Sequence, residues 1–183
     1  FCLSRGLGDV YKRQGRQASL PTFVSMLDQV QKQLGPFDTV IGHSLGGAAA
    51  GYALSTPVGK GFQRAVLVAA PADIENVVRR FGAFLWINDD VRQRMQLLVE
   101  QRYQKDMASL AVSRYGRQVE VPVLLVHDQQ DQEVPADDLQ SFAEGLRHRR
   151  VLQTRGLGHL KILKDSATME AVVEFVCAKD GNL

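Results

Sequence analysis

Residues 40–47 read V-I-G-H-S-L-G-G, and the fold of the chain can be worked out from this stretch. The largely apolar residues 37–41 indicate a buried strand, and the small residues 46–50 indicate the start of a helix. Between them lies G-x-S-x-G with Ser44 at its centre. This pattern in this context is typical of a serine held at a sharp turn from strand to helix.

The turn predicts a specific chemistry for its serine. We expect Gly42 and Gly46 to be required because side chains at these positions would collide across the turn. The turn would present the Ser44 hydroxyl at the positive end of a helix. The backbone N–H of Leu45 would then point to the place where an oxyanion forms.

Length and composition limit the class of protein. The chain has 183 residues, 45% hydrophobic and 23% charged, which suits one folded domain and excludes a disordered or membrane-spanning chain. No signal-peptide pattern is visible. Cys2 and Cys177 are too few for a disulfide framework, so we expect a cytoplasmic location. No metal-ligand spacing or nucleotide fingerprint is visible, and we expect neither metal nor cofactor.

Residues 1–14 (FCLSRGLGDVYKRQ) differ from the rest of the chain. They resemble the translated read-through of a sequencing adapter at the end of a metagenomic reading frame, and we predict that they are not native; a genuine loop is the alternative. They carry the whole net charge of +2, so the remaining residues are neutral. The charge therefore gives no reason to expect a nucleic acid or a membrane as partner.

Strands alternate with helices along the rest of the sequence. Ser19 followed by Pro21 predicts a helix start, and Gly35-Pro36 predicts its end. Continuous apolar runs are typical of parallel strands buried on both faces. The predicted strands are residues 37–41, 65–69, 121–126 and 151–153, and later helices are predicted at residues 139–146 and 169–176.

The segment between the second and third predicted strands is far longer than a usual crossover. Its apolar residues recur at helical spacing, so we predict a helical cap insertion at about residues 72–118. Two interpretations are open for the aromatic residues of this segment, Phe81, Phe84 and Trp86. They line an acyl pocket, or they are ordinary residues of the hydrophobic core.

Polar residues follow three of the predicted strands. Ser44 follows the first strand, H-D-Q-Q-D-Q-E-V-P at residues 127–135 follows the third, and G-L-G-H at residues 156–159 follows the fourth. The carboxyl ends of parallel strands meet at one edge of a sheet, where ligands bind. A nucleophile, an acid and a histidine thus occur in the order Ser, Asp, His.

These motifs resemble the α/β-hydrolase family of serine esterases and lipases, from about Ser19 to the C-terminus. The resemblance implies Ser44 as nucleophile through G-H-S-L-G-G, Asp131 as acid through H-x-x-x-D-x-x-V-P and His159 as base through G-x-G-H. It implies a serine hydrolase that cleaves an ester or similar acyl bond of a small molecule through an acyl-enzyme.

Other histidines and acids remain to be placed. Asp128 is an alternative candidate for the acid. We favour Asp131 because its spacing to Val134-Pro135 matches the motif. We expect His43 to be a packing or loop residue, and the His127 ring to hydrogen-bond neighbouring backbone.

The sequence also departs from the family. In this family further strands precede the nucleophile strand, and one of their loops carries the second oxyanion N–H. We therefore expect residues 15–183 to be the C-terminal part of an α/β-hydrolase domain, with a parallel sheet of about four strands. We expect esterase activity in the full-length parent, and aggregation or weak activity in the 183-residue chain.

Two other functions stay open. An acyltransferase uses the same turn as GHSLGE, but Gly47 stands in place of its glutamate. A non-catalytic, hydrolase-like fragment is the third reading.

Overall fold

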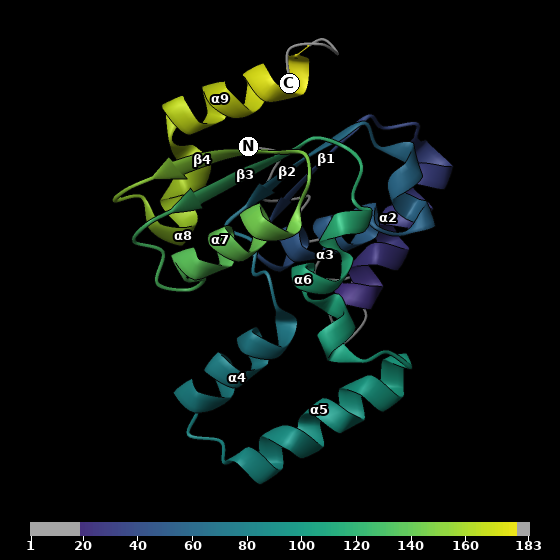
Figure 1. Cartoon of the computed structure of the whole chain (residues 1–183), viewed down its shortest axis with the longest axis vertical. Helices are drawn as coiled ribbons and strands as arrows, with labels where there is room; N and C mark the ends of the chain where they lie inside the picture. Colours follow the sequence, from purple (N-terminus) through teal and green to yellow (C-terminus); the bar gives the residue numbers. More distant parts are fainter. Residues whose placement is uncertain (1–18, 179–183) are drawn as a thin grey trace, which may run out of the picture.

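Four parallel strands form the central sheet of the computed structural model, which describes residues 19–178 (Figure 1). They lie in the order β1-β2-β3-β4, and each pairs in parallel with the next. Every residue of β2 and β3 is buried, as expected for apolar strands covered on both faces. The predicted parallel α/β sheet is confirmed. The strands are β1 (Thr39–His43), β2 (Arg64–Val68), β3 (Val123–Asp128) and β4 (Arg149–Thr154).

Helices cover both faces of this sheet (Figure 1). Alternate residues of each inner strand point to opposite faces, so two separate cores form. Leu67 and Leu125 pack with Phe142 on one face, whereas Val66 and Leu124 belong to the core of the other. The first face is covered by α3 (Leu45–Leu54), α6 (Val112–Tyr115) and α7 (Ala136–Gly145), and the second by α9 (Ser166–Cys177).

Helix α2 (Leu20–Leu34) has the predicted ends. The Ser19 hydroxyl accepts a hydrogen bond from the Thr22 N–H, and Gly35 caps the C-terminus. Part of its apolar face remains exposed, at Met26, Val30 and Leu34.

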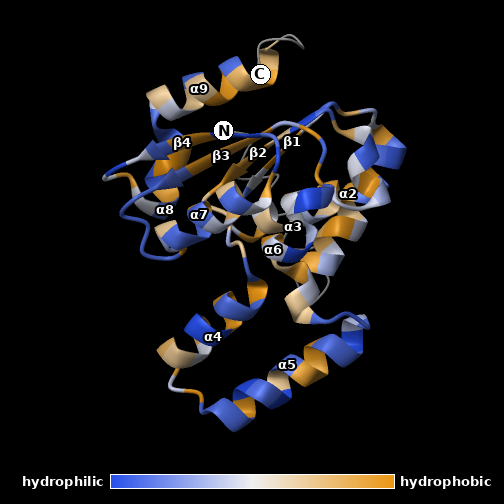
Figure 2. Cartoon of the chain, viewed as in Figure 1, coloured by the Kyte–Doolittle hydropathy of each residue, from blue (hydrophilic) through white to orange (hydrophobic). Residues whose placement is uncertain are grey.

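The long connection between β2 and β3 is helical. Helices α4 (Ile74–Phe84) and α5 (Asp89–Tyr103) project away from the sheet, and Figure 2 shows apolar and polar residues interleaved on both. Phe81, Phe84 and Trp86 are 57%, 78% and 94% exposed, so they are not core residues. Helical spacing identifies an apolar face without showing that anything covers it.

Short helical segments form the remaining connections. None of the helices among residues 19–178 is long and apolar enough to cross a membrane. The segment predicted to be non-native, residues 1–14, lies outside the described residues. The short segments are η1 (Pro57–Gly61), η2 (Met107–Leu110), η3 (Gly116–Gln118), α8 (Gly158–Lys161) and η4 (Ile162–Lys164).

Strand β1 lies at the edge of the sheet and, within the part of the chain that is described, pairs with β2 alone. Ile41 on this strand is 57% exposed. A hollow of about 260 Å³ lies beside it, lined by Phe23, Met26, Leu27 and other apolar residues of α2, β1 and α3. An apolar surface therefore adjoins the open edge.

Candidate active site

Ser44 lies between the end of β1 and the start of α3. Its φ of 53° and ψ of −128° are rare for an L-residue, and such strain persists only where the surroundings fix it. The Ser44 N–H donates to the Val68 carbonyl at 2.9 Å, and its carbonyl accepts from the N–H groups of Gly47 and Ala48. The hydroxyl makes no capping hydrogen bond to α3. Ser44 is therefore not an ordinary helix cap.

Two glycines allow this turn to form, and one of them differs from the prediction. A Cβ on Gly42 would lie 2.5 Å from the Gly46 carbonyl oxygen, so Gly42 is required. A Cβ on Gly46 would meet nothing within 4 Å, so the expectation for Gly46 was wrong. The second glycine that the turn requires is Gly47, because a Cβ added there would lie 2.7 Å from the Ala70 Cβ. The first turn of α3 packs against the end of β2 through Gly47.

Asp131 and His159 come together at the carboxyl end of the sheet. The Asp131 Oδ2 lies 2.7 Å from the His159 Nδ1, and both residues are buried. The other carboxylate oxygen, Oδ1, accepts hydrogen bonds from the N–H groups of Glu133 and Val134 at 2.8 and 2.9 Å. One oxygen is thus fixed by backbone and the other faces the imidazole. This arrangement fixes the His159 ring through its Nδ1 and leaves the Nε2 on the side away from Asp131.

Asp128, the rival acid, has a different set of partners. Its Oδ2 accepts from the Thr154 hydroxyl at 2.7 Å and the Leu157 N–H at 3.0 Å, and its Oδ1 accepts from the Gln130 N–H. Burial alone would raise the pKa of this carboxyl, but these hydrogen bonds outweigh burial and lower its pKa from 3.8 to about 2. Asp128 ties β3 to the loop that carries His159, whereas Asp131 contacts the imidazole itself.

Three further side chains surround this pair. As expected, the His127 ring bonds to backbone, with its Nε2 2.9 Å from the Val134 carbonyl oxygen. The His43 Nε2 lies 3.0 Å from the His159 carbonyl oxygen, so the residue before Ser44 touches His159 directly. The exposed carboxylate of Glu133 lies 3.7 Å from the His159 Nε2. Sequence reasoning missed the last two contacts, since nothing local relates the three segments.

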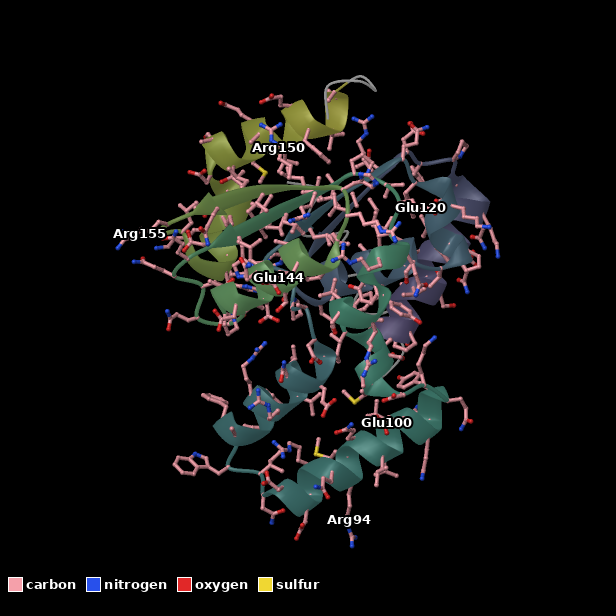
Figure 3. The ribbon with its side chains drawn as sticks, in the orientation of Figure 1. Arg94, Glu100, Glu120, Glu144, Arg150 and Arg155 are labelled. Atoms are coloured by element: carbon pink, nitrogen blue, oxygen red, sulfur yellow. The ribbon has the colours of Figure 1, made fainter. Side chains whose placement is uncertain are left out.

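A cavity of about 910 Å³ opens beside Leu45, the residue after Ser44. It lies between the α4–α5 pair and the sheet domain, and Figure 3 shows Arg94 on the outer side of α5, pointing away from that domain. The lining of this cavity does not include Phe81, Phe84 or Trp86. The apolar part of the lining on α4 and α5 is Ile74, Val77, Val78, Met95, Leu98 and Val99.

Comparison with known proteins now identifies the family. Residues 8–160 match the family described as serine hydrolase (FSH1). The chain belongs to this family. A comparison with curated proteins found no match to this sequence.

Solved structures similar to this chain include α/β hydrolases. One similar structure is the esterase domain of a Rhodothermus marinus protein, with 19% identity and a TM-score of 0.58. The match covers 86% of this chain and 66% of the Rhodothermus marinus chain. An α/β-hydrolase enzyme, MGS-MChE2, from a lagoon-sediment metagenome has 17% identity and a TM-score of 0.63, covering 87% and 70% of the two chains. The meta-cleavage product hydrolase of Pseudomonas fluorescens has 17% identity and a TM-score of 0.63, covering 90% and 74%. At these identities the similarity establishes the α/β-hydrolase fold.

Proposed function

We propose that this protein cleaves carboxylic esters, or similar acyl bonds, through a triad of Ser44, His159 and Asp131. The contact of 2.7 Å between the Asp131 Oδ2 and the His159 Nδ1 carries the proposal. The strained turn at Ser44 supports it, because the hydroxyl is not used as a helix cap. We also propose a cytoplasmic location, on the ground of the low cysteine content alone.

The reaction would proceed in two steps. As the Ser44 Oγ attacks the carbonyl carbon, the His159 Nε2 takes its proton, and Asp131 stabilises the imidazolium that forms. The Leu45 N–H would donate to the oxyanion of the tetrahedral intermediate. His159 then protonates the leaving alcohol, and the Ser44 acyl-enzyme remains. Water then attacks the acyl carbonyl carbon while His159 takes one of its protons, and His159 returns that proton to the Ser44 Oγ as the bond between Ser44 and the acyl group breaks and the acid leaves.

A fluorophosphonate probe tests the function directly, because it reacts with an activated serine. We expect stoichiometric labelling of Ser44 in the protein encoded by the complete gene, and hydrolysis of p-nitrophenyl esters. Folded protein that is neither labelled nor active would support the non-catalytic reading. A product ratio that favours acyl transfer to an added alcohol or thiol over hydrolysis would support the acyltransferase.

The cavity beside Leu45 suggests where the acyl group binds. Its walls on α4 and α5 are mainly apolar, and the residue next to the nucleophile lines it, so we propose that it holds an apolar acyl chain. The cap, rather than the sheet, would then set the preference for chain length.

Val99→Phe tests this role of the cavity. We expect the larger side chain to lower kcat/KM for long-chain relative to short-chain p-nitrophenyl esters by about tenfold or more. Leu97→Phe is the matched control, since Leu97 lies on the same helix but does not line the cavity. Equal changes in the chain-length profile of both variants would contradict the proposed acyl site.

A further inference from the structure

His43 lies at the end of β1, one residue before Ser44, and its ring is half-buried. The ring centroid lies 4.6 Å from that of His159, and the His43 Nε2 lies 3.0 Å from the His159 carbonyl oxygen. A carbonyl oxygen can only accept a hydrogen bond, so the His43 Nε2 carries the proton and donates it. The mechanism proposed above does not use this side chain.

We propose that His43 is a positioning residue, which fastens the backbone of His159 to the end of β1, the strand that leads into Ser44, and so fixes the position of the imidazole. This inference rests on the proposed function. It assigns His43 no contact with the substrate.

The local structure around His159 explains why such an anchor is needed. His159 belongs to α8, a helix of only four residues, and Gly156 and Gly158 before it have positive φ angles. So short a helix, with one glycine as its first residue and another two residues before it, does not hold its own backbone firmly. Asp131 fixes the ring from the loop after β3, and His43 fixes the main chain from β1. Since a misplacement of about 1 Å can cost about 100-fold in rate, the second anchor has a catalytic effect.

The charge of His43 is compatible with this role. Burial lowers the pKa of His43 below its ordinary value of 6.5, and the nearby charge of His159 lowers it further. The hydrogen bond to the His159 carbonyl and the carboxylates of Asp131 and Glu133 act in the opposite direction but do not reverse the shift. His43 is therefore neutral near neutral pH. A neutral ring does not repel the imidazolium that forms on His159 during each step.

Two amide variants separate positioning from simple packing. In His43→Gln the amide nitrogen can occupy nearly the position of the Nε2, whereas in His43→Asn the amide is one methylene too short to reach the His159 carbonyl. We expect His43→Asn to lower kcat by about tenfold to 100-fold, with KM changed by less than about twofold. We expect His43→Gln to recover most of that loss. The rate of fluorophosphonate labelling of Ser44 should follow kcat in both variants.

The melting temperature of each His43 variant is measured together with its kcat, so that a loss of stability can be told from a loss of positioning. Normal kcat in folded His43→Asn would overturn the inference, and so would equal losses of kcat in the two variants. A loss of activity that followed the melting temperature alone would also overturn it, because His43 would then be a packing residue. If the unsubstituted protein itself were neither labelled nor active, the proposed function would fail instead of this inference.

Discussion

Replacing Ser44 with alanine is expected to lower kcat/KM for ester hydrolysis by at least about four orders of magnitude, and His159→Ala should cost about as much. In the proposed mechanism both residues act in the same proton transfer, so the double variant should be little worse than either single variant. The measurement is the initial rate with p-nitrophenyl esters in folded protein. Activity within about tenfold of the unsubstituted protein for either variant would exclude the triad.

Ser44→Gly provides a control for structural damage. The φ of 53° and ψ of −128° at Ser44 strain an alanine as they strain the serine, whereas glycine adopts such angles at low cost. We therefore expect both variants to be inactive but the glycine variant to have the higher melting temperature. If Ser44→Gly is inactive but melts no lower than the unsubstituted protein, its inactivity cannot result from unfolding.

Asp131→Asn should lower kcat by about four orders of magnitude, because an amide would favour the wrong tautomer of His159. Asp128→Asn should leave kcat within about tenfold of the unsubstituted protein, because the Asp128 hydrogen bonds hold the loop rather than the imidazole. Its cost should appear in the free energy of unfolding, as a loss of about 2 kcal/mol. The reverse ranking of the two kcat values would make Asp128 the acid.

The pH dependence of unfolding tests the structural role of Asp128. The pKa of Asp128 is about 2 in the folded protein and 3.8 ordinarily, so the unfolded chain binds its proton more readily. Asp128 therefore stabilises the fold fully above about pH 4, and this stabilisation is lost as the pH falls toward 2. We expect Asp128→Asn to be less stable near neutral pH, with the difference shrinking in acid. Urea unfolding of both proteins across this range measures it.

Local patterns predicted the elements of the fold well. The Ser19 cap, Pro21 and Gly35 fixed the ends of α2 because helix termini depend on neighbouring residues alone. The apolar runs of β2 and β3 predicted burial on both faces because such residues are stable only there. The motif spacings led to Ser44, Asp131 and His159, and the structure places Asp131 rather than Asp128 against the imidazole.

Features that depend on distant partners could not be predicted. The close approach at Gly47 depends on Ala70, which lies two residues after the end of β2. The spacing of Phe81, Phe84 and Trp86 is the same for a covered face as for an exposed one. The contact of His43 with His159 spans 116 residues of sequence and leaves no local signal.

Among residues 19–178, no strand pairs with the outer edge of β1, and this affects the exchange of its amide protons with solvent. The Ser44 N–H bonds to Val68 on β2, and amides two residues apart in a strand point the same way, so those of Gly42 and Val40 also face β2. The amides of Ile41 and His43 face the open edge. In deuterated water the alternate amides of one short strand should therefore exchange at very different rates. Any segment that pairs with this edge would slow exchange at Ile41 and His43 and leave their neighbours unchanged.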